Sequence, residues 1–424
     1  MFDFETKVRH LRSLRPTRPG AAGKRSNRRR TTAFECLEER CCPSTVDLWL
    51  GGAGNYSNAA NWSLGVVPNN GNSYDGQPAT FTVEIANSSA VTLDINPTID
   101  NLSIDATSSL SIPNGQSLTV VGSGSTTGTI NNSGTIALEA TGSYASLKAS
   151  GTVSLTGGGK VTMSDSSGNL IDEATSNSTL TNVNNTIQGS GEIGNNGLSL
   201  NNQSRIDANQ SSTLLIDAPT MTNTGTLEAT GGGTLEILNS SATNTNGTIS
   251  TDGSSSSAIL YNSAITGGNL SSTNGAEIHG IGNPSLNGVT ITSGSTYSVD
   301  PGQFTSLTGD LTNYGTILIG NSGGGSILYP AAPTVYLFGG GTVTLNNASS
   351  HLRGSASSDT LMNEDNTIQG QGNIDGLNFI NQATVNANVA GGTLTVQAPR
   401  AYAPLFPGFS GVFMENITES YNVT

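Results

Sequence analysis

The sequence predicts an all-β solenoid, and three observations support this prediction. Residues 132–136 (NSGTI) return as 223–227 (NTGTL) and as 313–317 (NYGTI), after 91 and then 90 residues. Aliphatic residues alternate with Ser and Thr in short runs such as 117–120 and 341–345, the period of half-buried strands. Gly, Asn and β-branched residues are too dense for a helical apolar stripe. Repetition at a fixed period indicates an array whose units bury their apolar faces on one another.

A second marker keeps the same spacing. IQGSG at 187–191 returns as IHGIG at 278–282 and as IQGQG at 368–372. The predicted solenoid spans residues 83–399. After the first coils, residues 83–130, the two markers define three units at 131–221, 222–311 and 312–399. A coil of roughly 20 residues would make each unit four or five coils.

Asparagine and glycine have a specific role in this prediction. Both tolerate the left-handed backbone conformation that a coil corner requires. Asparagine side chains can also stack in register and form hydrogen bonds along the stack. We therefore interpret Asn-x-Gly-Thr-Ile/Leu as a corner followed by a strand.

Charge divides the chain into two parts. Residues 1–46 hold 11 of the 16 Lys and Arg and only 5 acids, a net charge of +6. Residues 47–424 hold the other 5 basic residues and 25 acids, a net charge of −20, and the two parts sum to −14. Such an acidic body repels nucleic-acid phosphates, so no nucleic-acid partner is expected.

Cysteine use and hydropathy narrow the class further. Cys36, Cys41 and Cys42 all lie in the basic segment and do not make a zinc-ligand set. No run reaches the 18 or so apolar residues of a membrane-spanning helix. The N-terminus is basic but lacks the apolar core of an ordinary signal peptide. We therefore expect residues 1–46 to be a disordered leader or sorting segment.

Two short stretches resemble known families. Residues 34–44 (FECLEERCCPS) resemble the N-terminal motif of large planctomycete surface proteins, in which a basic stretch precedes Leu-Glu-x-Arg and often Pro-Ser. Residues 49–63 (WLGGAGNYSNAANWS), followed by Val67-Pro68 and Phe81, resemble the opening of autotransporter-like β-helix repeat proteins. The first resemblance implies export or sorting. The second implies a right-handed parallel β-helix.

The ends of the body leave alternatives open. Trp49 and Trp62, in residues 47–82, suit a hydrophobic N-terminal cap, and their rings would also suit a carbohydrate platform. We favour the cap, because an open solenoid end exposes unpaired strand edges. Residues 400–424 concentrate aromatics and are either a C-terminal cap or a truncated end.

Candidate catalytic groups are sparse. A glycosidase needs two carboxylates about 5–10 Å apart, and a lyase needs a basic residue and calcium-binding acids. The acids considered are Asp165, Asp172, Glu173, Glu192, Asp207, Asp217, Asp310, Glu364 and Asp365. The basic residues of the body are Lys148, Lys160, Arg205, Arg353 and Arg400, with His279 and His351.

Comparison of the first and third units argues against catalysis. Asn185, Ile187 and Gly191 are matched by Asn366, Ile368 and Gly372, whereas Glu192 is matched by Asn373 and Asp207 by Asn386. The repeat therefore specifies corners and core, and charges vary as on a solvated face. His279 takes the place of Gln188 and Gln369, which predicts a polar corner position. His351, near Arg353, is expected on the surface without a partner set.

These observations favour a non-catalytic protein without catalytic, cofactor-binding or metal-binding residues. We expect a secreted or cell-surface structural or adhesin-like rod, monomeric, with extracellular polysaccharide or a cell-surface matrix as partner. The alternative is a carbohydrate-active or carbohydrate-binding β-helix that resembles polysaccharide lyases or glycosidases. Three or more acids that converge in one groove with a basic residue would favour this alternative.

Overall fold

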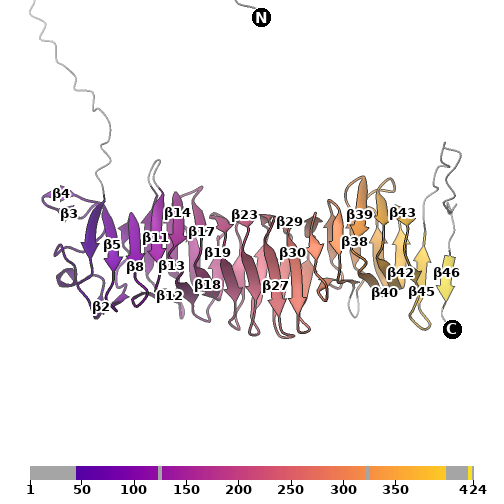
Figure 1. The fold of residues 1–424 in the computed structure, drawn as a ribbon, viewed down its shortest axis with the longest axis horizontal. Helices are drawn as coiled ribbons and strands as arrows, with labels where there is room; N and C mark the ends of the chain where they lie inside the picture. The colour runs from indigo at the N-terminus through magenta and orange to yellow at the C-terminus, as the bar shows by residue number, and fades with distance from the viewer. Residues whose placement is uncertain (1–43, 123–126, 321–323, 398–418, 423–424) are drawn as a thin grey trace, which may run out of the picture. The chain divides into compact units, whose positions relative to one another are not determined.

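The chain folds into a β-solenoid of about 14 stacked parallel coils, as a computed structural model shows (Figure 1). The structure describes residues 44–122, 127–320, 324–397 and 419–422. The predicted all-β solenoid is therefore confirmed. Most of the predicted leader, residues 1–43, and most of 400–424 lie outside the described residues.

Three parallel ladders of strands make up the solenoid, and each coil passes through ladder 1, then ladder 3, then ladder 2. Ladder 1 contains β1 (Thr45–Leu48), β5 (Phe81–Ile85), β8 (Asn101–Ile104), β11 (Gly128–Asn132), β14 (Thr152–Thr156), β17 (Thr179–Asn182), β20 (Ser199–Asn202), β23 (Thr220–Asn223), β26 (Ser241–Thr243), β29 (Ala264–Thr266), β32 (Ser285–Asn287), β35 (Phe304–Leu307), β38 (Ile327–Pro330), the second halves of β40 (Thr342–Arg353) and β42 (Thr367–Asp375), and β45 (Thr393–Val396).

Ladder 2 contains β7 (Thr98–Ile99), β10 (Ser117–Val121), β13 (Ala145–Ser150), β16 (Asn169–Glu173), β19 (Gly191–Ile193), β22 (Leu214–Ile216), β25 (Thr234–Leu238), β28 (Ser257–Tyr261), β31 (Glu277–Ile281), β34 (Thr296–Val299), β37 (Thr316–Ile319), the first halves of β40 and β42, and β44 (Val385–Asn386). Ladder 3 contains β2 (Ala53–Asn55), β6 (Ala90–Thr92), β9 (Ser109–Pro113), β12 (Thr135–Glu139), β15 (Lys160–Met163), β18 (Thr186–Gly189), β21 (Arg205–Ala208), β24 (Thr226–Ala229), β27 (Thr248–Asp252), β30 (Asn269–Thr273), β33 (Thr290–Ile291), β36 (Leu311–Asn313), β39 (Thr334–Phe338), β41 (Thr360–Asn363) and β43 (Asn378–Asn381).

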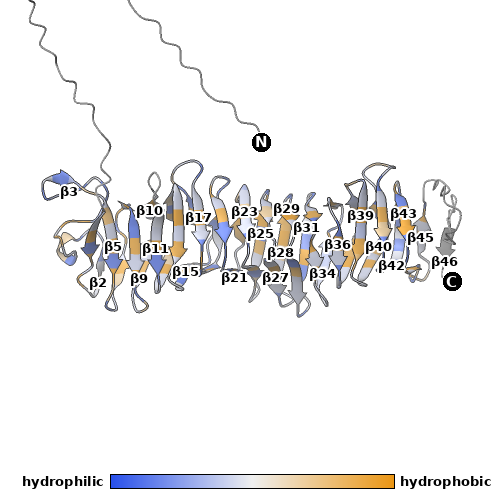
Figure 2. Ribbon diagram, turned by 45° about the horizontal axis from the view of Figure 1, so that its top comes forward, coloured by the Kyte–Doolittle hydropathy of each residue, from blue (hydrophilic) through white to orange (hydrophobic). Residues whose placement is uncertain are grey.

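The core is a set of aliphatic rows that run along the solenoid axis. In ladder 3 one such row is in continuous register and fully buried: Ile136, Val161, Ile187, Ile206, Leu227, Ile249, Leu270 and Ile291. Apolar and polar residues alternate along the strands (Figure 2). Each buried aliphatic side chain contributes about 1.5–3 kcal/mol relative to exposure, so the rows are the main stabilising element.

A buried stack of asparagines lines the corner between ladders 1 and 3. Asn182, Asn202, Asn223 and Asn244 lie on successive coils with no exposed surface. The Nδ2 of each donates to the Oδ1 of the next, at 2.9, 2.8 and 2.7 Å. The predicted asparagine stacking is confirmed, and it satisfies polar groups that burial would otherwise penalise.

The first sequence marker forms a corner, but not always the same corner. Asn132 and Asn223 end strands of ladder 1 and lead into ladder 3. Asn313 instead ends β36 of ladder 3 and leads into β37 of ladder 2. The local contact is nevertheless kept, because Asn132 donates to Asn185 at 2.9 Å and Asn313 donates to Asn366 at 3.0 Å. The motif therefore specifies a corner and the strand after it, independently of the ladder.

The second sequence marker (IQGSG, IHGIG and IQGQG) requires glycine at its third position, because neighbouring atoms leave no space for a Cβ. Gly189 and Gly370 have φ of +128° and +110°, and a Cβ there would lie 1.9 and 2.0 Å from the carbonyl oxygens of Met163 and Leu345. The middle copy differs, because a Cβ on Gly280 would meet the Tyr297 hydroxyl, and Gly280 has no positive φ. The sequence repeat is thus stricter in the first and third units than in the second.

Parallel pairing begins within the segment predicted as the N-terminal cap. β1 pairs with β5 and β2 pairs with β6, so these strands already belong to the ladders. The same segment contains the short 3₁₀ helix η1 (Ala59–Asn61) and the antiparallel hairpin β3 (Ser73–Tyr74) and β4 (Gln77–Pro78). At the other end, β46 (Glu419–Asn422) pairs antiparallel with β45. In the described part of the chain, no helix combines the length and apolar character needed to cross a membrane.

We expect Asn202→Ala to lower the free energy of unfolding by about 1–3 kcal/mol, because it leaves the neighbouring amides of the stack unpaired in the core. Asn201→Ala is the matched control. Asn201 is the preceding residue, points outward, and should change stability by less than about 0.5 kcal/mol. Chemical denaturation followed by circular dichroism measures both, and equal midpoints would contradict a structural role for the stack.

We also expect Gly189→Ala to destabilise the coil by more than about 1 kcal/mol, because a Cβ meets the Met163 carbonyl and φ is positive. Gly142→Ala is the control, because a Cβ there has nothing within 4 Å and its φ is not positive. Thermal melting of the two variants should separate them. A melting temperature of Gly189→Ala at or above that of the control would show that the close approach is absent.

Candidate functional site

The two tryptophans are buried and form part of the N-terminal core. Trp49 and Trp62 are 3% and 1% exposed, and their ring centroids lie 5.0 Å apart in an edge-to-face arrangement. Tyr56 packs against Trp62 at 4.9 Å, and the Trp62 indole donates to the Tyr56 carbonyl at 2.8 Å. Rings buried in this way cannot stack on a sugar, so the carbohydrate platform considered for these tryptophans is wrong.

One group of acids lies together on ladder 2, beside a lysine. The Lys148 Nζ contacts the Asp172 Oδ2 at 2.8 Å, and Asp172 is almost completely buried. Burial raises the pKa of Asp172 despite this ion pair. Burial and the charges of Asp217 and Asp172 raise the pKa of Glu192, and burial raises that of Asp217. This acidic row, Asp172, Glu192 and Asp217 with Lys148, is the closest approach to a catalytic arrangement among the described residues.

Two oxygens at the acidic row have no partner in the described structure. They are the buried Oδ1 of Asp172 and Oε2 of Glu173. Glu173 packs against Gly197, where a Cβ would lie 2.3 Å from its Oε1. Neither ion pairing nor hydrogen bonding thus fully compensates the burial of these carboxylates, which accounts for the raised pKa of Asp172.

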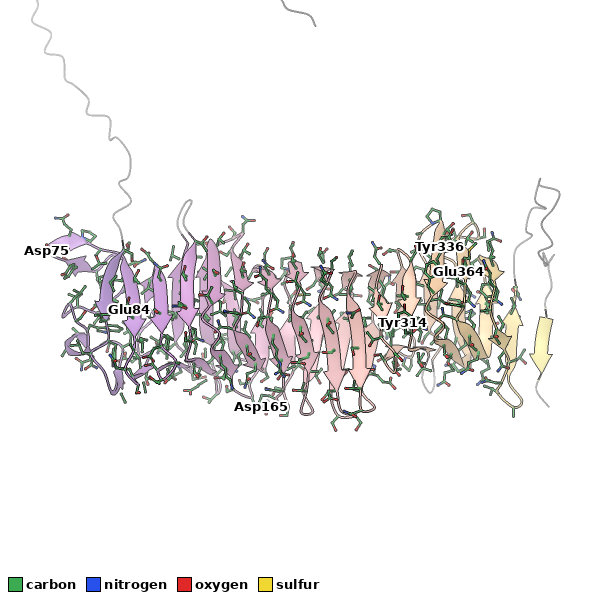
Figure 3. All side chains as sticks on the ribbon, in the orientation of Figure 1. Asp75, Glu84, Asp165, Tyr314, Tyr336 and Glu364 are labelled. Carbon is green, nitrogen blue, oxygen red and sulfur yellow. The ribbon has the colours of Figure 1, made fainter. Side chains whose placement is uncertain are left out.

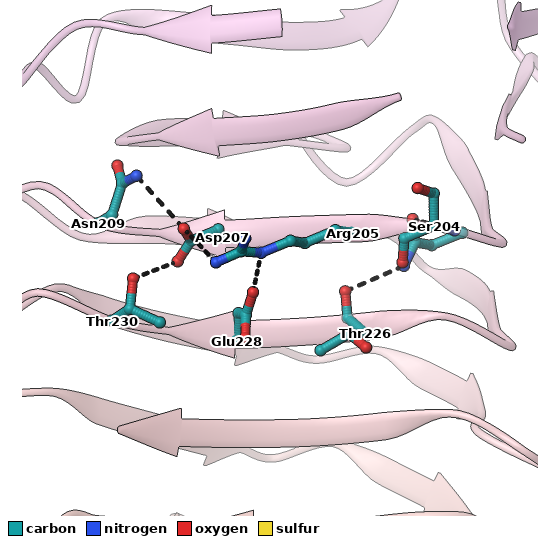
Figure 4. A network of polar contacts seen from close by, with 8 residues as sticks. Ser204, Arg205, Asp207, Asn209, Thr226, Glu228 and Thr230 are labelled. Carbon is teal, nitrogen blue, oxygen red and sulfur yellow. Dashed lines mark hydrogen bonds and ion pairs between the residues drawn. The ribbon is translucent and has the colours of Figure 1, made fainter. Parts of the chain in front are cut away.

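A second charged cluster lies on ladder 3 (Figure 4). Arg205 forms ion pairs with Asp207, at 3.0 Å, and with Glu228 on the next coil. Thr230 and Asn209 donate further hydrogen bonds to Asp207. Burial raises the pKa of Glu228 although Arg205 opposes this shift. Because the basic group is saturated by acids, this cluster stabilises adjacent coils and leaves no free base.

Both histidines of the body have acidic partners. His279 lies within β31, not at a corner as predicted, and its Nδ1 lies 2.8 Å from Asp300. This hydrogen bond raises the pKa of His279. His351, expected to lack partners, contacts Asp375 at 3.1 Å and Arg353 at 3.0 Å. Both differences arise because the sequence does not show which residues neighbouring coils bring together.

The remaining acids cap corners or lie on the surface. Asp165 accepts hydrogen bonds from Ser211 and from the Ser212 amide, and it lies on the outside of the solenoid (Figure 3). Asp310 accepts from the Tyr336 amide and Asp365 from the Gly340 amide. Glu364 and Tyr336 lie at the outer surface of the solenoid (Figure 3). Lys160 lies exposed on β15, and Arg400 is outside the described residues.

Ladder 1 has a surface that the sequence analysis did not identify. Its strands from β8 to β38 contain no Asp, Glu, Lys or Arg, and their outward residues are mostly Ser, Thr and Asn. The signal is present in the sequence as short runs such as TLTN and TMTN. It can be recognised only when the register shows that these runs lie beside one another.

Neither a cavity nor a metal centre is found in the described part of the chain. The interior gap lined by Ile130, Leu147 and Val153 has no room for a water molecule. No three His, Cys, Asp or Glu residues among those described are placed to hold a metal ion. Neither a comparison with protein-family models nor one with curated proteins gives a match.

We expect Glu192→Gln to raise the melting temperature at pH 7 and to have no effect below pH 4. A raised pKa means that the folded state binds the proton more tightly, so wild-type stability increases as the pH falls through the folded pKa. The gain is complete below the unfolded value of 4.5. At neutral pH the wild-type protein buries an ionised carboxylate at position 192 at a cost in stability, and the neutral amide of the variant avoids this cost.

Asp165→Asn is the control, and it should shift the melting temperature at pH 7 in the opposite direction. Hydrogen bonds from Ser211 and Ser212 lower the pKa of Asp165, so its contribution is present above the unfolded value of 3.8 and is lost as the pH falls through the folded pKa. Asp165→Asn should therefore lower the melting temperature at pH 7. Shifts of the same sign for both variants would contradict the assigned environments.

Proposed function

We propose that the chain is a non-catalytic structural or adhesin-like rod, secreted or exposed at the cell surface. The single observation that carries the proposal is the uncharged outer surface of ladder 1 from β8 to β38, on a body that carries a net charge of −20. A stacked solenoid held by backbone ladders and aliphatic rows displays such a surface over many coils without a cofactor or disulfide. Extracellular polysaccharide or a cell-surface matrix is the proposed partner.

A carbohydrate-active β-helix is the second candidate, and the acidic row on ladder 2 favours it. Three carboxylates with raised pKa beside one lysine meet part of the requirement for acid–base chemistry. Two features weigh against it. Asp172 and Lys148 already neutralise each other, and the gap that Lys148 helps to line has no room for a water molecule.

Fractionation of the native cells, with activity assays on the purified full chain, tests the proposal. We expect the protein in the surface or secreted fraction, and no sugar release from neutral or uronate-containing polysaccharides. The proposal fails if the protein is found in the cytoplasm. Sugar release that Asp172→Asn or Glu192→Gln abolishes, while Asp165→Asn does not, would establish the second candidate instead.

A further inference from the structure

The outer surface of ladder 1 is a regular array of small polar side chains, which we name the hydroxyl lane. One row, in register from coil to coil, is Asn101, Thr129, Ser154, Thr181, Asn201, Thr222, Thr243, Thr266 and Asn287. The second row is Thr152, Thr179, Ser199, Thr220, Ser241, Ala264 and Ser285. Neighbours are spaced about 4.8 Å along the solenoid and about 6.7 Å along each strand.

The protein uses the hydrogen-bonding groups of the lane at one end, where Asn101 donates to Thr82 and accepts from the Thr129 amide, but not in its middle part. From β17 to β32, its side chains make no hydrogen bond within the described structure, although all of them are at least partly exposed. The neighbouring inward asparagines are, in contrast, paired in the buried stack. Charged groups on ladder 3 are also paired in the Arg205 cluster. From β17 to β32 the side chains of the lane therefore retain their capacity to donate and accept hydrogen bonds.

The chemistry of the lane selects its partner. Hydroxyl and amide groups both donate and accept, so the partner must offer both kinds of group. A polyanion is disfavoured, because the body carries a charge of −20 and the lane supplies no compensating cation. The lane is a ladder face many coils long, so an extended polymer can contact several coils at once, and weak contacts add up.

A surface of ice would also match the hydrogen-bonding pattern of the lane. The side chains at one end of the lane favour a sugar instead. Phe304 is 43% exposed on β35, and Tyr329 on β38 is in register with Ser306 of the preceding coil. The Tyr329 hydroxyl donates to the Asn283 side chain at 3.0 Å, which fixes its ring. Aromatic rings provide apolar faces that pack on the C–H faces of sugar rings, whereas an ice lattice offers no such apolar face.

We propose that the hydroxyl lane binds a neutral, unbranched polysaccharide lengthwise, with its contact ending at Phe304 and Tyr329. This inference rests on the proposed surface function and names the binding face and the class of partner. It assigns no role to the acidic row of ladder 2.

Binding of the purified full chain to insoluble polysaccharides tests the lane. The neutral probes are microcrystalline cellulose and insoluble β-1,3-glucan, and immobilised polygalacturonate is the anionic probe. The lane variant is Thr222→Lys with Thr243→Lys, two register neighbours on ladder 1. The matched control is Thr226→Lys with Thr248→Lys, two register neighbours on ladder 3 of the same coils. Both variants carry the same change in charge.

We expect wild type and the ladder 3 control to bind at least one neutral probe, and the lane variant to bind about tenfold more weakly, because two coils lose their contacts. Phe304→Ser, at an exposed position, should also weaken binding and provides a second test if the lane variant fails to fold. Circular dichroism checks the fold of each variant.

The inference is overturned by no binding to either neutral probe, by equal loss of binding in the lane and control variants, or by binding to polygalacturonate alone. Thermal hysteresis of ice growth without polysaccharide binding would assign the lane to ice instead. The proposed function fails separately, through a cytoplasmic location. A surface protein whose lane variant still binds like wild type would overturn only the assignment of the face.

Discussion

Register between successive coils is the constraint on which the rest of the structure depends. The inward aliphatic side chains are buried only if every coil keeps the same register with its neighbours. A shift of one residue would move the inward side chains of a strand to the outer face. The asparagine stack enforces this phase at one corner, where each amide pairs with the amide directly above or below it and with nearby backbone carbonyls. Hydrophobic burial thus supplies most of the stability, and the buried amides supply specificity.

The same register creates the outer faces. Once inward positions are fixed, outward residues of successive coils form continuous rows, and each row acquires the chemistry of its ladder. Between β8 and β38, charged residues of the strands lie on ladders 2 and 3, including the acidic row and the Arg205 cluster. Ladder 1 collects Ser, Thr and Asn over many coils. A polar surface that extends over many coils suits adhesion along a rod better than catalysis in a pocket.

Much of the fold could be predicted from the sequence because its signals are local. Alternation in runs such as 341–345, and Asn and Gly at the corners, report strands and turns directly. The asparagine stack could be predicted for the same reason. Coil phase could not, because loops vary in length from coil to coil. The third Asn-x-Gly marker therefore falls on a different corner from the first two, which a spacing of 90 and 91 residues does not reveal.

The site was less predictable than the fold, because it depends on contacts between coils. In the sequence His351 has no acidic residue beside it, but it meets Asp375 across the ladder. The sequence left two roles open for Trp49, and burial in the structure decides between them. The hydroxyl lane exists only when strands of neighbouring coils are aligned.

Residue-resolved hydrogen exchange tests the continuous coil most directly. The account predicts that the backbone amides in the strands of all three ladders from β5 to β42 are protected from exchange. Protection confined to separate blocks, with freely exchanging stretches between them, would contradict it.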